Sequence, residues 1–531
     1  MHKPRLAVIV DRGHLQKYQL DALNATDAEE ITIFSCTNTV LRRRPVKHGL
    51  YYLLNLASVR NAHKRSVALS ELRLPVKDVI EFTSGYKGAW QSLPDPIVEK
   101  LREGAFDAVF KAGMGLMRVP PADRLPVPIL SFHHGDPDLY RGRPAGFYEI
   151  LNGERKMGQI VQVISDTLDG GAVIAFAETR ISPHSYRATL EEAFRHSHLL
   201  LPQALRNIRA GRTVAKHSQG KNDRLPSNLT VARFVLQTAG ATLRRLAGRA
   251  LVEKSWHVAT VATDGAPADL LRSEADFPPM SEWTRLQPIR PFHSYADPFP
   301  SRSPAGLLVT ASNRGTGKGE IVLVRDDGRQ VPLSPAPGRV SYPAGMEENG
   351  RAYVVPDIAA WSPPRIYAVD DERLQEVGML DVADNPAILD PTFLRRDGHL
   401  YLFGNIKELG SNALFLWHSP SLFGRFEPHP ASPVRISPGG GRMAGNPVAD
   451  GTDLFRLGQD RLGGKGGGLF VFRIDQLSPT EYSEQQVGEI RFSGSGGPHI
   501  LNFADGRAIF DWCRERTSPL AGIRRVIGRY L

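Results

Sequence analysis

Two adjacent histidines lie in SFHHGDPDLYRGRP, positions 131–144, with two aspartates and two arginines close behind. Imidazole titrates near neutral pH, so a histidine beside a carboxylate can move protons between reacting groups. The apolar VPIL that precedes the stretch is typical of a buried strand. Along an extended strand alternate side chains share a face, which puts Ser131 and His133 on one side. Phe132 and His134 then face the other, with His134 supporting the site from behind.

A second polar segment, ISDTLDGGAV, follows about thirty residues later. Asp166 and Asp169 precede Gly170 and Gly171, and glycine allows a tight turn and a close ligand approach. Alone, each acid is an ordinary turn residue. Together with His133 and in this order, Asp169 indicates an acid/base pair in which the carboxylate orients the imidazole and stabilises its charged form.

The elements that must position these residues are strands and helices in alternation. Strands are predicted in RLAVIV, EEITIFSC, VKDVIEFTS, FDAVFKAG and VPILSFHH, and helices in HLQKYQLDALNA and DPIVEKLREG. GQIVQVISDTLDGGAVIAFAETRI reads as two strands around a turn, followed by a long helix. This pattern predicts a parallel, doubly wound α/β sheet, whose ligands bind beyond the carboxyl ends of the strands.

The motifs from FDAVFKAGMGLMRVP through ILSFHHGDPDLYRGRP to VISDTLDGGAVI resemble the folate-dependent formyltransferase family, which includes methionyl-tRNA and sugar-nucleotide formyltransferases. The resemblance covers roughly residues 1–205 and implies a Rossmann-like domain. It places His133 on the family's catalytic histidine and Asp169 on its aspartate. It implies 10-formyltetrahydrofolate as the formyl donor and a primary amine as acceptor.

The resemblance also implies binding residues. For the donor these are the loop that wraps the pterin and one acid of the following turn: Gly113, Met114, Gly115, Leu116, Met117 and Asp166. For the acceptor they are the Arg-Gly loop residues Tyr140, Arg141 and Gly142.

One position departs from the family pattern. The family has asparagine where this chain has Ser131, and its amide helps hold the oxyanion that develops on the formyl group. Loss of one such donor costs about a hundredfold to a thousandfold in rate. The Ser131 hydroxyl or His134 could take its place. The alternative is a fold kept for binding, with catalysis lost.

The second half of the chain is rich in Gly, Pro and short β-branched runs. A turn-plus-polar signature recurs about every fifty residues, as expected of a repeat architecture. Its five copies surround Asp297, Ser341, Asp390, Arg442 and His499. Five units predict an all-β five-bladed propeller, in which the SWHVATVA strand completes the last blade. A β-sandwich or two smaller β-domains are the alternatives.

The segments YADPF, VSYPAG, ILDPTFL, GRMAGNP and GPHILNF resemble the N-terminal domain of glucosamine inositolphosphorylceramide transferases, itself similar to five-bladed furanosidase propellers. The resemblance covers roughly residues 254–531. It places Asp297, Asp357 and Asp390 near the propeller axis, where two carboxylates could flank a sugar bond. Aspartates that stabilise turns between blades are an equally good interpretation. We therefore expect glycan binding, through Asp297 and Asp390, more than hydrolysis.

The whole chain has 531 residues and a formal net charge of +10. Its boundaries are predicted as a formyltransferase-like domain at 1–205, a basic helical linker at 206–253 and the propeller at 254–531. Basic clusters such as Arg42–His48 are dispersed and carry no groove-reading motif, which disfavours nucleic acid. No signal peptide or transmembrane run is evident, while the basic helix leaves peripheral membrane contact open.

The chain has two cysteines, which support neither a disulfide framework nor a cysteine metal site. We therefore expect no bound metal and a cytoplasmic setting. The leading hypothesis is an enzyme that formylates the amine of an amino sugar or glycoconjugate, presented by the propeller. The first alternative is a non-catalytic carbohydrate-binding protein. The second is a glycosidase or glycosyl transferase centred on Asp297 and Asp390.

Overall fold

The computed structural model describes residues 3–37, 46–58, 62–167, 169–263, 265–272, 277–313, 319–333, 340–358, 363–370, 373–464 and 466–524. Most of the basic cluster Arg42–His48 lies outside these residues. The chain divides into two compact units, Met1–Leu243 and Arg244–Leu531. No helix of the described ranges is long and apolar enough to cross a lipid bilayer.

The first unit is built on one nine-stranded sheet. Its strands are β1 (Arg5–Asp11), β2 (His14–Gln16), β3 (Glu30–Cys36), β4 (Ser66–Ala68), β5 (Val76–Phe82), β8 (Ala108–Lys111), β10 (Ile129–His133), β12 (Lys156–Val163) and β13 (Val173–Arg180). The central strands β5, β3, β1, β8 and β10 are parallel, as predicted, while β12 and β13 join antiparallel. The parallel strands are continuous apolar runs because both faces of the sheet are covered.

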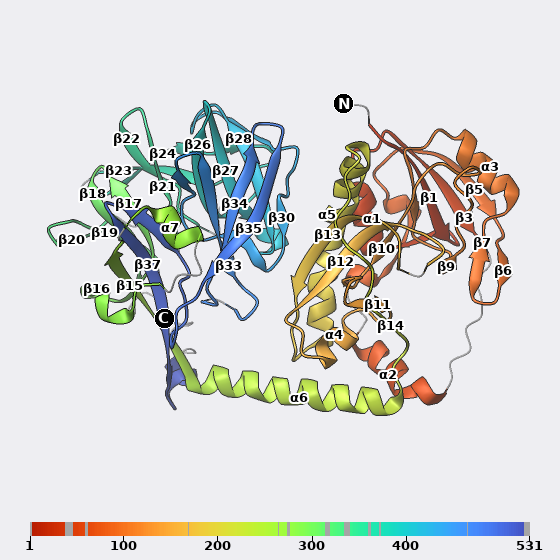
Figure 1. The fold of residues 1–531 in the computed structure, drawn as a ribbon, viewed down its shortest axis with the longest axis horizontal. Coiled ribbons are helices and arrows are strands. Elements are labelled where there is room, and N and C mark those ends of the chain that lie inside the picture. Colours follow the sequence, from red (N-terminus) through yellow and green to blue (C-terminus); the bar gives the residue numbers. More distant parts are fainter. Residues whose placement is uncertain are drawn as a thin grey trace. The chain divides into compact units, whose positions relative to one another are not determined.

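Helices cover the two faces of this sheet (Figure 1). They are α1 (Lys17–Asn24), α2 (Gly49–Ser58), α3 (Asp95–Glu103), α4 (Phe147–Leu151) and α5 (Tyr186–Arg209). The apolar side of α3 packs with Ile9, Val109 and Ile129 in one core cluster. On the other face α1 and α5 enclose a second cluster around Tyr18 and Phe194. The parallel doubly wound arrangement thus extends from β5 to β10.

Two small sheets lie beside the carboxyl ends of these strands. One contains β6 (Gly85–Lys87), β7 (Trp90–Ser92) and β9 (Leu116–Met117), and the other pairs β11 (Tyr140–Gly142) with β14 (Lys221–Asp223) in parallel. The stretch 206–253, predicted as a basic helical linker, contains β14 as well as the long helix α6 (Asn228–Leu251). Part of the predicted linker is therefore a strand of the α/β unit.

The described part of the second unit folds into five sheets that are mainly antiparallel. In chain order the strands of the first four are β15 (Val252–Ala262), β16 (Thr284–Leu286), β36 (Leu501–Ala504) and β37 (Arg507–Thr517); β17 (Phe292–Arg302), β18 (Ala305–Asn313), β19 (Gly319–Val324) and β20 (Gln330–Pro332); β21 (Gly345–Glu348), β22 (Arg351–Val354), β23 (Arg365–Val369) and β24 (Leu374–Met379); and β25 (Asp381–Val382), β26 (Ile388–Arg396), β27 (His399–Ile406), β28 (Ala413–Ser419), β29 (Arg425–Pro428) and β30 (Arg435–Ile436). The last has β31 (Gly439–Met443), β32 (Val448–Asp450), β33 (Asp453–Asp460), β34 (Leu469–Leu477) and β35 (Tyr482–Ile490), with helix α7 (Pro267–Arg272) against it.

The first and last strands of this unit lie in one sheet. β15, the strand predicted from SWHVATVA, pairs with β37 from Val252↔Thr517 to Ala262↔Arg507, and the two ribbons run side by side (Figure 1). Chain ends that share a sheet hold the whole strand-rich unit together.

Candidate functional sites

His133 ends β10 and meets Asp169, which lies in the turn between β12 and β13. The ring Nδ1 is 3.4 Å from Asp169 Oδ1, and both side chains are largely buried. The ring Nε2 is 3.2 Å from the carbonyl oxygen of Tyr140, which can only accept. Both ring nitrogens therefore face acceptors, and a ring carrying two protons can donate to both. The structure brings together the two residues that the sequence pairs.

Asp169 is held by further contacts. Its Oδ2 accepts the Gly142 backbone N–H at 2.9 Å, and its Oδ1 accepts from Gln162 Nε2 at 3.3 Å. Asp169 has a positive φ of 49°, a backbone conformation that aspartate tolerates better than most residues. The carboxylate thus links the Arg-Gly loop to the end of β10.

Gly135 gives the His133 ring its room. A Cβ at this position would lie 2.7 Å from His133 Nε2 and 2.9 Å from the Tyr140 oxygen. Any side chain here would displace the ring from the carbonyl that orients it.

A cavity of about 170 Å³ opens beside this pair, and we call it the Ser131 cavity. Its lining consists of Trp90, Lys111, Gly115, Leu116, Met117, Ser131, Phe132, Gln162, Ile164, Ser165, Thr167 and Asp169. Three of the five predicted donor-loop residues are among them. Gly113 and Met114, the first two residues of this loop, are not in the lining, and the Met114 N–H donates to Asp11 Oδ1 at 2.9 Å. Asp166 is exposed and accepts from the Val119 N–H at 3.3 Å, outside the lining.

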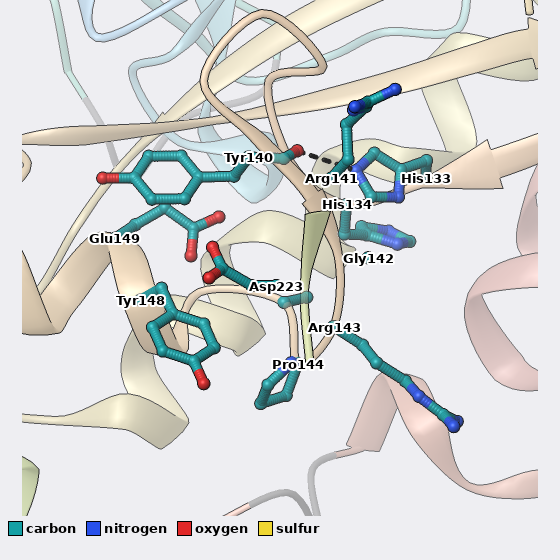
Figure 2. A pocket seen from close by; sticks show the side chains of 11 residues that line it. His133, His134, Tyr140, Arg141, Gly142, Arg143, Pro144, Tyr148, Glu149 and Asp223 are labelled. Atoms are coloured by element: carbon teal, nitrogen blue, oxygen red, sulfur yellow. Dashed lines mark hydrogen bonds between the residues drawn. The ribbon is translucent and has the colours of Figure 1, made fainter. Parts of the chain in front are cut away.

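A smaller hollow of about 10 Å³, which we call the Tyr148 hollow, has room for about one water. Its lining consists of His133, His134, Tyr140, Arg141, Gly142, Arg143, Pro144, Ala145, Tyr148, Glu149 and Asp223. Figure 2 shows the carboxyl groups of Glu149 and Asp223 between the rings of Tyr140 and Tyr148, while Arg143 points away from them. All three predicted acceptor-binding residues line this hollow.

The predicted acceptor residues are fixed by hydrogen bonds. The Tyr140 hydroxyl donates to Glu154 Oε1 at 2.9 Å, and burial raises its pKa to about 12, so it stays protonated. Arg141 Nε donates to the Gly220 oxygen at 2.7 Å. Gly142 has φ 85°, and a Cβ there would lie 2.3 Å from the Asp223 oxygen.

His134 faces away from Asp169, as the strand alternation predicts. Its ring lies 4.4 Å from the Phe194 ring and 5.3 Å from the Tyr18 ring, centre to centre, and Nε2 contacts Ser197 Oγ at 2.9 Å. Burial, and then the charge of Lys64, hold the pKa of His134 well below its usual value. A neutral ring in this cluster favours packing over catalysis.

The residues of these sites that the sequence motifs did not single out include Lys111, Gln162, Glu149 and Asp223. Lys111 could have been found from the sequence, because it is a charged residue at the end of the otherwise apolar strand AVFK. Burial raises the pKa of Glu149 to about 7. Asp223 belongs to β14. Its place beside Tyr148 depends on the pairing of β14 with β11, which lies about eighty residues earlier in the sequence.

In the second unit the signature residues of different sheets converge. Arg442 Nη2 donates to Asp390 Oδ1 at 2.7 Å and lies 3.7 Å from Asp357 Oδ2. Asp297 Oδ2 accepts from Thr310 Oγ1 at 2.9 Å and from the Tyr342 N–H at 3.3 Å. All three aspartates are buried. The structure therefore gathers Asp297, Asp357 and Asp390 around one arginine and one backbone amide.

His499 joins this group from the sheet that contains both ends of the unit. Its Nδ1 is 3.1 Å from Asp511 Oδ2 and 3.4 Å from Asp297 Oδ1. Ligand atoms of these three residues lie within 4.8 Å of one another, a spacing that could hold a metal ion. Alternatively, a proton on His499 Nδ1 can be shared between the carboxyl oxygens of Asp297 and Asp511 without a metal.

Asp357 and Asp390 differ in their contacts with Arg442. Burial raises the pKa of Asp357 to about 7, the nearby charge of Asp390 adds to the shift, and Arg442 opposes it. Asp390 instead takes the direct contacts from the Arg442 guanidinium. Arg442 thus contacts Asp390 directly and lies 3.7 Å from Asp357.

The two halves of the chain are similar to different known proteins. Residues 336–496 match the family described as glucosamine inositolphosphorylceramide transferase 1, N-terminal. Glucosamine inositolphosphorylceramide transferase 1 of Arabidopsis thaliana is 26% identical over 156 residues, which are 28% of this chain and 20% of that protein. The chain thus matches about a fifth of the length of this relative.

Solved structures similar to this chain are formyltransferases and a formyltetrahydrofolate deformylase. Glycinamide ribonucleotide transformylase 1 from Symbiobacterium toebii is 18% identical, with 40% of this chain and 92% of that chain covered and a TM-score of 0.29. An N-formyltransferase from Helicobacter canadensis, in complex with folinic acid and dTDP-3-aminofucose, is 10% identical, covers 45% and 80%, and has a TM-score of 0.27. The deformylase from Pseudomonas putida KT2440 is 16% identical, covers 40% and 70%, and has a TM-score of 0.26. The chain is thus similar to formyltransferases in its structural neighbours and to the glucosamine inositolphosphorylceramide transferase N-terminal family over residues 336–496.

Proposed function

We propose that the first unit transfers a formyl group from 10-formyltetrahydrofolate to a primary amine of an amino sugar or glycoconjugate. The observation that carries this proposal is the contact between His133 and Asp169, with Nδ1 and Oδ1 3.4 Å apart, at the border of two hollows. Asp169 lines the Ser131 cavity and His133 lines the Tyr148 hollow. An acid/base pair between two binding places suits a reaction that joins two substrates.

The Ser131 cavity suits the ring of a folate donor. Its volume of about 170 Å³ is smaller than whole drug-sized ligand sites, so it fits a ring system with the rest of the donor outside. Leu116, Met117 and Trp90 supply apolar surface. Gln162 Oε1 is buried and accepts no hydrogen bond from the described residues, so it can take a ring N–H.

The folate, when bound, supplies the formyl carbon: the acceptor nitrogen bonds to that carbon, the bond from the carbon to N10 breaks, and a proton lost by the amine ends on N10. His133 is placed to hold that proton in between. Asp169 stabilises the charged ring and, through the Gly142 N–H, keeps the Arg-Gly loop in register with it. These roles follow from contacts that the free protein already makes.

The Tyr148 hollow suits the acceptor amine. The Asp223 carboxylate attracts an ammonium group, and the rings of Tyr140 and Tyr148 offer faces for a sugar ring or a cation. The hollow has room for about one water, so the reacting amine alone would enter while the rest of the acceptor stays outside. This favours an amine on a larger molecule.

We also propose that the five sheets of the second unit are the five blades of a β-propeller that binds the glycan part of the acceptor. In support, Asp297, Tyr342, Asp390, Arg442 and His499 come from successive repeats and contact one another directly or through shared partners. Strands near a propeller axis converge in this way. Asp297 and Asp390 would be the sugar-binding acids.

Glycoside cleavage is the second candidate function, and Asp357 favours it. With a pKa of about 7, Asp357 can give a proton near neutral pH, and the neighbouring carboxyl of Asp390 would be the second acid of the pair that glycosidases use. Release of reducing sugar from glycosides, abolished by Asp357→Asn, would support it. Sugar binding without release would leave a binding module.

We propose a cytoplasmic setting for this reaction. Cys36 and Cys513 are both buried and form no disulfide, which suits a reducing compartment.

The proposed donor is tested by titration with 5-formyltetrahydrofolate, a stable analogue. Binding should quench the fluorescence of Trp90, which lines the Ser131 cavity. The Trp90→Phe variant assigns the signal to this site. Absence of saturable binding, measured in parallel by calorimetry, would contradict the proposal.

A further inference from the structure

Lys111 is a charged residue in the Ser131 cavity for which neither the motifs nor the acid/base pair provides a role. It is the last residue of β8, after the buried Ala108, Val109 and Phe110. β8 lies between β1 and β10 in the sheet, so its carboxyl end opens beside Ser131. The strand thus delivers one ammonium group to the cavity wall.

This ammonium is held near acids without being tied to them. The charged groups that face it are Asp11, at the end of β1, and Asp169. Within the described residues it makes no hydrogen bond and no ion pair within 4.0 Å. Asp11 instead accepts the Met114 N–H. Lys111 therefore keeps its donors for something that enters the cavity.

The Ser131 side of the cavity is short of donors. The Ser131 hydroxyl is 3.5 Å from the Phe132 carbonyl oxygen, a weak contact at best. Gln162 donates its amide to Asp169 and presents its carbonyl oxygen to the cavity. Among the described residues that line this cavity, Lys111 is the one cation. It could therefore stabilise a negative charge that develops on a formyl oxygen bound there.

We propose that the Lys111 ammonium donates a hydrogen bond to the formyl oxygen and stabilises the negative charge that develops there, a task for which the Ser131 side chain is too short. This inference rests on the proposed formyl transfer. It assigns to Lys111 the electrostatic part of catalysis, while His133 and Asp169 handle the proton.

The pH dependence separates this role from simple support of the site. Burial lowers the pKa of Lys111 to about 8, and Asp11 and Asp169 oppose the shift. The group is therefore charged at neutral pH and loses its proton as the pH rises through about 8. Transfer should fall over the same range if the charge itself acts on the formyl oxygen.

The test compares Lys111→Met, Lys111→Arg and Lys64→Met in the full chain. Lys64 is the control because it is a second lysine of the same unit whose pKa burial lowers, and it lies over the Phe194 ring, outside both hollows. Single-turnover conversion of 10-formyltetrahydrofolate to tetrahydrofolate is followed from pH 6 to 10. The acceptors are a panel of nucleotide-linked amino sugars, with water, which yields formate, as the minimal one.

We expect Lys111→Met to lower the maximal rate about a hundredfold while the affinity for 5-formyltetrahydrofolate changes about threefold or less. Lys111→Arg should keep within about tenfold of the wild-type rate and stay active above pH 9, because arginine remains charged. Lys64→Met should match wild type.

Three results would overturn the inference. If the Lys111→Met variant kept the wild-type rate, the inference would be overturned while the proposed formyl transfer would stand. A loss of folate affinity as large as the loss of rate would make Lys111 a ground-state binding residue instead. Absence of any formyl release by the wild-type chain would overturn the proposed function, and this inference with it.

Discussion

At the residue scale, Asp169 is where the first site is assembled. Its carboxylate contacts His133, the Gly142 N–H and the Gln162 amide, which come from three separate segments. One acid therefore sets the imidazole and the Arg-Gly loop at the same time. The pairing of His133 with Asp169 was predictable from the order of the motifs.

The burial of Lys111 and the place of Asp223 could not be predicted in that way. The first depends on which polar groups happen to face a strand end. The second depends on β14, three residues whose pairing with β11 leaves no periodic pattern in the sequence.

Substitution of His133 by asparagine should lower formyl transfer at least about a hundredfold, since it removes the proton carrier. Asp169→Asn should cost a similar factor because it also disturbs the Gly142 contact. His198→Asn is the control, as His198 is a half-buried histidine that contacts the Arg195 oxygen, and it lines neither hollow. Equal rates for His133→Asn and the control would contradict the assignment.

His134 should matter for stability and not for turnover. In His134→Phe the ring still fills the cluster with Tyr18 and Phe194, but the contact with Ser197 is lost. We expect a loss of about 1 kcal/mol in the free energy of unfolding of the first unit. Chemical denaturation measures it. A large fall in rate with unchanged stability would instead make His134 a stand-in for the missing asparagine.

Asp357 should make the stability of the second unit pH-dependent. Its pKa rises from 3.8 to about 7 on folding, so between these values the folded state binds more protons than the unfolded state. Stability from this group is therefore present below about pH 4 and is lost as the pH rises to about 7. Asp357→Asn should flatten that slope in urea denaturation measured from pH 4 to 7.5. An unchanged slope would place the titration elsewhere.

At the element scale, the pairing of β11 with β14 shapes the Tyr148 hollow. Gly142 has no side chain because the Asp223 oxygen lies where its Cβ would be, 2.3 Å away. The sequence predicted the α/β strands well because their apolar runs are long and continuous. It did not predict the strand Lys221–Asp223 within the linker at 206–253, because this strand is polar and only three residues long.

Gly142→Ala tests this element against Gly153→Ala. Both glycines have positive φ, 85° and 80°, but nothing lies within 4 Å of the Cβ position of Gly153. Both variants should pay the backbone strain of about 1 kcal/mol. Only Gly142→Ala must also push β14 away, so it should lose transfer activity about tenfold or more. Equal activities in the two variants would show that the close approach of β11 and β14 does not matter for the site.

At the scale of the whole molecule, each unit has its own core and its own site. In the second unit β15 and β37 pair, so that its first and last strands lie in one sheet. The strand-rich character of this unit was predictable because short β-branched runs alternate with Gly- and Pro-rich turns, and the five-bladed propeller stays a prediction. The sequence did not predict which of the signature residues contact one another. Contacts such as that of Asp390 with Arg442 depend on how the sheets face one another.

Val258→Asp should unfold the second unit selectively. Val258 is fully buried in β15, and an unpaired carboxylate there costs several kcal/mol. Calorimetry should show one of two thermal transitions lowered, and folate binding by the first unit should persist. Loss of both transitions together would mean that the two units fold as one.

The central claim is formyl transfer at His133, and mass spectrometry of the acceptor tests it most directly. Nucleotide-linked amino sugars are incubated with 10-formyltetrahydrofolate and the full chain, with His133→Asn as control. The account predicts an amino sugar that gains the mass of one carbonyl group with wild type and does not gain it with the variant. No formylated product from any amine, with wild type in excess over donor, would contradict it.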